Sequence, residues 1–372
     1  MTPTCKPPPA ACSPTRRGRN NAVRLTLFIP QLLWPEPDDQ ETLGGLPTPG
    51  FGWLAARATR QCWPAQPFET ALAARFGLDH PALGALRLLG EDAGEAAIDG
   101  YWLAADPAHL RFHHERIVLA DAEAFDLTPD EAAELAAALN AQLADLGQIH
   151  VASASRWYLC LNPAGRDFAA ACRHAAPPLS AVAGKCVDQP STAEATLNRW
   201  LNEAQMLLHG HPLNARREAR GQPPINSLWL WGGGRLTRPP PGRFTAVWSD
   251  HPLAIGLARA SGEPVHPLPE NFARFNALAS SGSHALIVLD ALLAPAIYED
   301  GEAWRAAWQQ LENNWFQPLA GPAGGIVNTL EIAAPTLYGN LHWSLAKGDR
   351  WKFWRRGETL AALAGELRKT QA

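Results

Sequence analysis

The 372-residue sequence predicts an α/β protein: a mostly parallel sheet covered by helices on both faces, with an inserted α-rich cap region. After residue 225, short apolar runs alternate with helical stretches of ten or more residues, as right-handed βαβ crossovers require. Between residues 95 and 224 the sequence is rich in alanine and this alternation breaks. We therefore expect a core formed by 22–94 and 225–372, an inserted cap at 95–224 and a disordered tail at 1–21.

The first strand of the core is expected to begin at Val23, in the run VRLTLFIPQLL, because β-forming apolar residues there are stopped by prolines. The clearest helix lies in DLTPDEAAELAAALNAQLADLG. There Thr128 and Glu131 form a capping box, and Pro129 occupies the first helical position. Gly147 is expected to end this helix.

Ser191 and Glu194 form a second capping box, and the helix that it starts has one apolar face. That face consists of Leu197, Trp200, Leu201, Ala204, Leu207 and Leu208. After residue 225 the expected strands are SLWLW, RFTAVW, HALIVLDALL and GGIVNTLEI. The expected helices are one from Pro252 to just before Gly262, then EAWRAAWQQLENNWF and ETLAALAGELRK.

Composition excludes several classes of protein. The net charge of -4 argues against a dedicated nucleic-acid or membrane-surface protein, because both depend on basic patches. The six cysteines form no C-x-x-C pair, so neither a zinc knuckle nor a disulfide framework is indicated. The sequence has no signal-peptide core and no run long enough to span a membrane. We expect a cytoplasmic protein.

Several motifs resemble one enzyme family. The main one reads His211-Pro-x-Asn214-x-x-Arg217-x-x-x-Gly221, then Pro224-Ile-Asn226, a strand and Gly232-Gly-Gly234. These residues, with LAADPAHL at 103–110 and LPTPGFGWLA at 46–55, resemble archaeal-type cofactor-independent phosphoglycerate mutases. LSAVAGKCVDQ and NRWLNEAQMLLHGHPLN are similar to a proteobacterial branch, the RPFE-type regulatory proteins. The resemblance covers most of 22–345 and implies an alkaline phosphatase-like core.

The same resemblance implies two metal ions and a serine nucleophile, and the residues needed for them are missing here. The first strand ends at Gln31, where the family has a carboxylate, and the aspartate of the Thr-Pro turn falls on Gly52. No serine lies between Ser13 and Ser153. A two-metal phosphotransferase needs a nucleophile and about six Asp or His ligands. We therefore expect no such centre.

The later metal motifs are also altered. Asp290 and Asp300 are isolated carboxylates, and Ile332 follows Glu331 where the family has metal-binding residues. His342 alone cannot complete a dinuclear site. The FHHER stretch, with His113, His114 and Glu115, is also a poor zinc site, because adjacent residues of a strand point to opposite faces. No metal and no other cofactor is expected.

The candidate ligand-binding residues are His211, Asn214, Arg217, Asn226 and Gly234. An arginine fork suits a phosphate or carboxylate, and glycines after a strand can let a phosphate approach backbone N–H groups. A structural interpretation stays open, in which Arg217 belongs to a solvated charge run and the asparagines cap a helix and a turn. His211 is then a residue that stops a helix. The family's arginine before the glycines is Trp231 here.

Two functional hypotheses follow. The first is a catalytically degenerate phosphoglycerate mutase-like protein that acts as a regulatory or ligand-binding module. Its expected partners are a small phosphorylated or carboxylated metabolite and a protein that docks on exposed tryptophans; neither a nucleic acid nor a membrane is expected. The alternative is an active phosphoglycerate mutase, phosphotransferase or hydrolase with altered chemistry, which would use His211, Arg217, Asp290 or Glu331. Arg355 and Arg356, after WKFW, either cap an amphipathic edge or bind an acidic partner.

Overall fold

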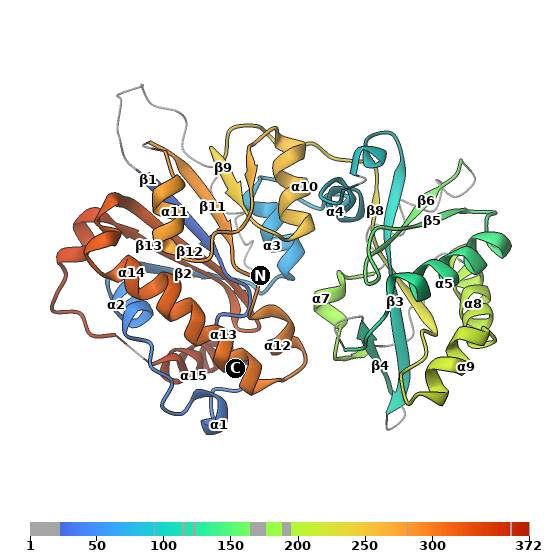
Figure 1. Cartoon of the computed structure of the whole chain (residues 1–372). Coiled ribbons are helices and arrows are strands. Elements are labelled where there is room, and N and C mark those ends of the chain that lie inside the picture. The colour runs from blue at the N-terminus through green and yellow to red at the C-terminus, as the bar shows by residue number, and fades with distance from the viewer. Residues whose placement is uncertain are drawn as a thin grey trace, which may run out of the picture.

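The chain forms two sheets, joined by helices, in the computed structural model (Figure 1). The structure describes residues 23–92, 94–113, 116–121, 124–163, 176–187, 195–280, 282–357 and 359–371. The expected tail at 1–21, the capping box of Ser191 and Glu194, and His114 with Glu115 lie outside these residues.

The larger sheet has seven strands and is mostly parallel, as predicted. Its order is β10 (Val265–His266), β9 (Ala246–Trp248), β11 (His284–Val288), β1 (Val23–Phe28), β12 (Val327–Thr336), β13 (Gly339–Ala346) and β2 (Thr59–Trp63). The pairs from β10 to β12 are parallel, and β13 pairs antiparallel with both β12 and β2. The first strand begins at Val23, as the apolar run indicates.

Helices cover both faces of this sheet, because successive side chains of β1 enter different apolar clusters. Leu25 and Leu27 pack with residues of α1 (Gln40–Leu43), α2 (Pro49–Arg57), α11 (Phe272–Leu278), α13 (Gly301–Leu311), α14 (Gln317–Ala320) and α15 (Leu360–Gln371). Phe28 packs on the other side with α3 (Phe68–Arg75), α10 (Pro252–Ser261) and α12 (Leu293–Ile297). The remaining turns are η1 (Gly94–Ile98), the π-helical η2 (Glu312–Phe316), η3 (Pro322–Ile326) and η4 (Lys347–Trp351).

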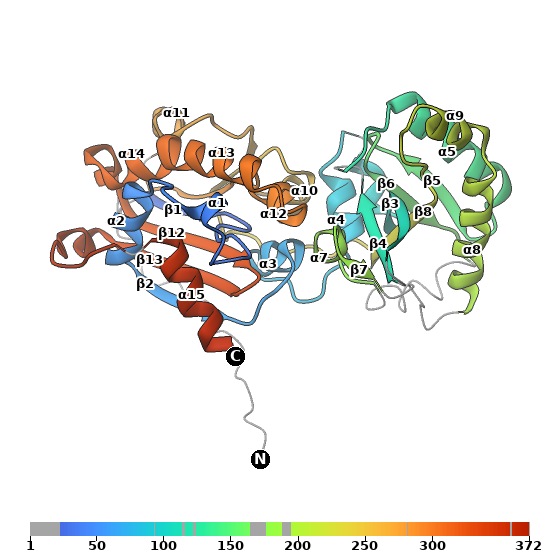
Figure 2. The ribbon, with the colours of Figure 1, turned by 90° about the horizontal axis from the view of Figure 1, so that it is seen from below.

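The second sheet is antiparallel and belongs largely to the inserted segment. Its order is β5 (Gly147–Val151), β6 (Trp157–Leu161), β3 (Tyr101–His113), β4 (Arg116–Asp121) and β7 (Cys186–Val187). The helices beside it are α5 (Pro129–Gln142), α7 (Leu179–Val182), α8 (Ala195–His209) and α9 (Pro212–Ala219) (Figure 2). Beside the helices expected for an α-rich cap, this segment therefore contributes five strands that the sequence did not predict.

One strand lies in a different sheet from the one expected. β8 (Ser227–Gly234) pairs antiparallel with β3, so the SLWLW run does not join the parallel sheet. All of its residues are buried: Leu228 and Leu230 face one apolar cluster, and Trp229 and Trp231 face another. A strand buried on both faces has the same apolar pattern in either kind of sheet, which is why the sequence did not distinguish them.

The local helix signals are confirmed with one change of boundary. Thr128 and Glu131 form the capping box, but α5 ends at Gln142, and Gly147 begins β5. The apolar face of α8 buries Trp200, Leu201, Ala204 and Leu208. No helix in the described parts of the chain is both long and apolar enough to cross a membrane.

The helix α4 (Leu83–Leu89) connects the two sheets through close backbone contacts. At its start, a Cβ on Gly84 would lie 2.6 Å from Ala104 N and 3.0 Å from Gly232 O, in the second sheet. At its end, a Cβ on Gly90 would lie 1.8 Å from Pro252 O, and one on Gly256 of α10 would lie 1.7 Å from Leu86 O. Glycine is required at these positions because no real Cβ fits such distances.

Gly256→Ala is expected to destabilise the protein by about 1–3 kcal/mol, because the added methyl group meets the backbone of α4. Gly365→Ala is the matched control: Gly365 also lies within a helix, α15, and has nothing within 4 Å of an added Cβ. That change should stabilise by up to about 1 kcal/mol, as expected for alanine in a helix. Urea unfolding of both variants measures the difference; equal effects would contradict the close packing.

Candidate functional site

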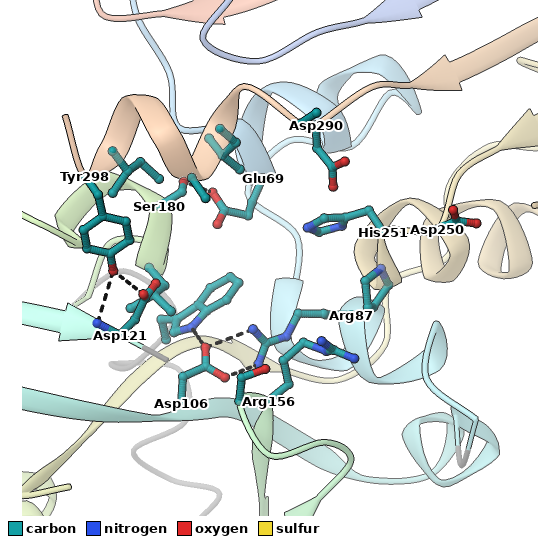
Figure 3. A pocket seen from close by; sticks show the side chains of 18 residues that line it. Glu69, Arg87, Asp106, Asp121, Arg156, Ser180, Asp250, His251, Asp290 and Tyr298 are labelled. Carbon is teal, nitrogen blue, oxygen red and sulfur yellow. Dashed lines mark hydrogen bonds and ion pairs between the residues drawn. The ribbon is translucent and has the colours of Figure 1, made fainter. Parts of the chain in front are cut away.

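A cavity of about 460 Å³ lies between the two sheets, at the carboxyl ends of parallel strands. β9 leads into Asp250 and His251, and β11 leads into Asp290. The facing wall carries Arg87 from α4 and Asp106 from β3 (Figure 3). Ligands of open α/β sheets gather at this edge, so we take the cavity as the candidate functional site.

A buried ion pair forms the floor of the cavity. Arg87 donates from its two terminal nitrogens to the two carboxylate oxygens of Asp106, at 2.9 and 2.6 Å. The Trp231 indole N–H donates to the same carboxylate at 2.8 Å. The Arg87 guanidinium also lies over the rings of Tyr158 and Trp231. The side chains of Arg87 and Asp106 are only 7% and 1% exposed, so each charge depends on the other.

A second arginine is paired in a similar way. Arg156 donates to both oxygens of Glu91, at 2.7 and 3.1 Å, and the Tyr158 hydroxyl donates to Glu91 at 2.8 Å. Burial, together with the charge of Glu91, raises the pKa of Tyr158, so the phenol stays protonated. Both arginines that line the cavity therefore already have a carboxylate partner.

His251 is held as a neutral imidazole. It is the N-cap of α10, and its Nδ1 accepts the Leu253 N–H at 3.1 Å. Burial, with the charges of Arg87 and Arg156 acting in the same direction, lowers the pKa of His251 to about 3. A neutral imidazole that accepts at Nδ1 has its proton on Nε2, so that nitrogen is a donor. Neither nitrogen then offers a metal ion a lone pair.

The other acidic residues of the cavity have partners as well. Ser180 donates to Glu69 at 2.6 Å, and burial raises the pKa of that carboxyl group. The Tyr298 hydroxyl donates to Asp121. Asp290 points toward His251 in Figure 3. Each of the two arginines in the cavity is paired with a carboxylate, and further acidic side chains line the wall. The cavity therefore has no excess of positive charge.

The residues present do not fit a pair of metal ions. No group of three or more His, Cys, Asp or Glu side chains that could hold a metal exists within the described ranges. After β1, Gln31 stands where the resemblance implies a carboxylate, and its side-chain oxygen is buried. At the Thr-Pro turn, Glu312 accepts the N–H groups of Gly50 and Phe51, at 2.5 and 3.1 Å. A buried carboxylate of the protein thus occupies the start of α2.

The structure places the predicted site residues away from this cavity, in β8 and in the helices and turns beside the second sheet. Asn214 is buried; its amide nitrogen donates to the carbonyls of Leu208 and Ile225, and its oxygen accepts the Ile225 N–H. Arg217, which is fully buried, donates to Glu131 at 2.7 Å and to the carbonyls of Asp126 and Pro223. These contacts fit the structural interpretation, and a binding role for both residues stays a prediction.

The other three predicted residues also make local contacts. Asn226 exchanges two hydrogen bonds with the backbone of Leu110, at 2.7 and 2.8 Å, and so fixes the start of β8 beside β3. His211 is the N-cap of α9. Gly234 is the last residue of β8 and pairs with Trp102, while Gly232 admits α4. None of the five residues lines the cavity.

Glu331, a candidate of the alternative hypothesis, lies in a separate polar cluster. It accepts from Arg75 at 2.8 Å and lies 3.3 Å from His342 Nε2. The hydrogen bond from His342 lowers the pKa of Glu331 to about 2, and the charge of Arg75 contributes in the same direction. This cluster lies on the face of the large sheet that α3 covers, outside the cavity.

Arg87, Arg156 and His251 are not among the site residues predicted from the sequence. A signal for Arg87 exists, since it is the one charge in the apolar helix LGALRLL and a buried charge needs a partner. The partner, Asp106, lies in the LAADPAHL segment already singled out. Nothing local to Arg156 or His251 predicts that the fold brings them together.

Together these features define an α/β protein whose parallel sheet carries a cavity at its carboxyl edge, closed by a second, antiparallel sheet. Among solved structures, the PH0037 protein from Pyrococcus horikoshii aligns over 94% of this chain and 96% of its own, with a TM-score of 0.52 and 16% identity. At that identity the likeness shows the fold alone. A cofactor-independent phosphoglycerate mutase from Thermoplasma acidophilum aligns over 92% of this chain and 94% of its own, at 16% identity. Its TM-score of 0.40 is too low to indicate a shared fold.

The sequence comparisons are narrower. A probable 2,3-bisphosphoglycerate-independent phosphoglycerate mutase from Geobacter sulfurreducens is 45% identical over 38 residues. The match spans 10% of this chain and 10% of that relative. No protein-family model matches the sequence.

Asp106→Asn is expected to cost about 3–5 kcal/mol of unfolding free energy, because it leaves the buried Arg87 charge without its partner while keeping an acceptor for Trp231. Adding Arg87→Met should recover most of the loss. Glu134→Gln, in the exposed pair with Arg216, is the control and should change stability by less than about 1 kcal/mol. If Asp106→Asn lost as little unfolding free energy as the control, the buried pair of Arg87 and Asp106 would not stabilise the floor of the cavity.

The pH dependence of stability should separate two groups. The folded pKa of His251 is about 3, below its ordinary 6.5, so the unfolded chain binds the proton first and stability falls as pH drops from 6.5 toward 3. Glu331, at about 2 against 4.5, loses its contribution as pH drops from 4.5 toward 2. His251→Asn, which keeps an N-capping side chain, should flatten the upper window, and Glu331→Gln the lower one.

Unfolding measured from about pH 2 to about pH 8 covers both windows, and each variant serves as the control for the other. The expected loss for His251 is on the order of 2–4 kcal/mol over its window. An unchanged slope between pH 6.5 and 4.5 in His251→Asn would show that the imidazole is not held neutral.

Proposed function

We propose that this chain is a phosphoglycerate mutase-like protein that does not transfer phosphoryl groups through two metal ions, and that it acts as a ligand-binding or regulatory module. The cavity between the sheets is its binding site. One observation carries the proposal: at the edge where metal ligands are needed, His251 uses Nδ1 as a helix cap and holds its proton on Nε2. The neighbouring side chains form no group that could hold a metal ion, as far as the structure describes the chain.

The charges of the cavity favour a particular class of ligand. The sequence suggested a phosphorylated or carboxylated metabolite, but Arg87 and Arg156 are already paired with Asp106 and Glu91. An anion would have to displace a carboxylate from one of these pairs. A small molecule with hydroxyl or amino groups would leave both arginine pairs in place and can donate to acidic side chains that line the cavity, such as Asp290. We therefore propose a small hydroxylated or amino-bearing ligand.

The competing proposal is an enzyme with altered chemistry. Phosphoryl transfer without metal needs several cationic groups around the phosphate to stabilise the charge that develops. The arginines lining the cavity already neutralise carboxylates, and His251 is neutral. These contacts favour binding over catalysis.

The purified full chain, incubated with manganese and 3-phosphoglycerate, should form no 2-phosphoglycerate, because the side chains needed to hold two ions are missing. The measurement is product formation, together with metal content after dialysis, for which fewer than two ions per chain are expected. Turnover that Asp290→Asn abolishes would contradict the proposal.

Calorimetric titration tests the ligand class separately. Glucosamine, used as a probe with hydroxyl and amino groups, should bind more tightly than 3-phosphoglycerate, and Asp290→Asn should weaken its binding about tenfold. Asp300→Asn, a change outside the cavity, is the control. Tighter binding of 3-phosphoglycerate would reinstate the anionic ligand.

A further inference from the structure

A short segment between β13 and α15 exposes three large aromatic side chains. Trp351, Phe353 and Trp354 are 79%, 81% and 66% exposed. The rings of Phe353 and Trp354 pack edge to face, with 5.4 Å between their centroids. Figures 1 and 2 show this dark red segment, which leads into α15, at the end of the molecule remote from the second sheet. Contiguous exposed aromatics of this size are uncommon on a protein surface and mark an interaction site.

The base of the segment is held firmly to the core. Arg350 donates to the carbonyls of Leu319 and Gly324, each at 2.9 Å. Asp349 accepts the Ala346 N–H at 2.9 Å and pairs with Lys352 at 2.7 Å. These bonds fix the backbone from which the aromatic side chains project, so their display does not require the segment to reorganise.

The segment is basic although the whole chain is acidic. From 347 to 357 it has five cationic residues and a single acidic one, whereas the net charge of the chain is -4. The acidic residue and two of the cations are used in the contacts at its base. Arg355 and Arg356 are exposed and their guanidinium groups make no hydrogen bond or ion pair with the described residues. This local excess favours an anionic surface, which the net charge alone does not indicate.

Beside the aromatic side chains lies a second cavity, of about 570 Å³, between α2, β2 and α15. Arg355 and Arg356 line it together with Arg60, which pairs with Glu366 at 2.8 Å. Within the described ranges, Arg355 and Arg356 form no ion pair with a carboxylate, and both face this cavity. It is larger than the carboxylate of an acidic side chain needs and has room for a phosphodiester headgroup.

We propose that this aromatic and basic segment, residues 351–356, docks on an anionic phospholipid surface, with a lipid phosphate at Arg355 and Arg356 and the three rings at the headgroup level. Tryptophan and phenylalanine beside cations are the composition of interfacial anchors, and an indole combines an apolar body with one N–H that headgroups can satisfy. An acidic protein would instead have to offer recesses for all three rings. The proposal does not depend on what the first cavity binds.

Sedimentation of the full chain with vesicles tests this proposal. Binding is expected to vesicles of equimolar phosphatidylcholine and phosphatidylglycerol, not to phosphatidylcholine alone, and it should weaken at high salt. Arg355→Gln with Arg356→Gln should weaken partitioning about 30-fold, from roughly 1 kcal/mol per cation. Replacing Trp351, Phe353 and Trp354 together by alanine should abolish it.

Arg220→Gln with Arg238→Gln removes two exposed arginines elsewhere and is the matched control, which should bind as the unchanged chain does. Equal losses in the control and in the Arg355 and Arg356 variant would overturn the proposal, as would failure to sediment with anionic vesicles at low salt. Polyglutamate binding that requires the same arginines and rings, without vesicle binding, would assign the surface to an acidic protein instead.

Discussion

The close approach of α4 to the second sheet on one side and to α10 on the other is the constraint on which the site depends. Gly84 and Gly232 let the start of the helix lie against β8, and Gly90 and Gly256 let its end lie against α10. This short helix carries Arg87, and His251 caps the start of α10, so the same contacts set the spacing between the two walls of the cavity. Because the backbones pack directly against each other, α4 and α10 have little freedom to move apart. The cavity is therefore preformed.

Within that frame, the chemistry of the cavity follows from how its charges are matched. Asp106 and Glu91 neutralise the arginines, and the arginines in turn help to keep His251 neutral. A site of this kind can orient a polar molecule through fixed donors and acceptors. It lacks the concentrated positive charge that phosphoryl transfer requires, and this difference separates the proposed function from the activity of the enzymes that the sequence resembles.

Local signals in the sequence predicted the elements well, and contacts between distant residues were harder to predict. The capping box at Thr128 and the apolar run from Val23 need only neighbouring residues, and both are confirmed. The sheet that β8 joins depends on its partner β3, about 120 residues away, which an apolar pattern does not encode. Asn214 looked available for a ligand because its bonds to Leu208 and Ile225 form only in the folded chain.

Glu312 has a further consequence for the start of α2. Its carboxyl group accepts the first N–H groups of α2, just after the Thr48-Pro49 turn. A helix start is where an incoming phosphate would otherwise find its best donors. A phosphate arriving at this helix start would therefore first have to displace the Glu312 side chain from these N–H groups.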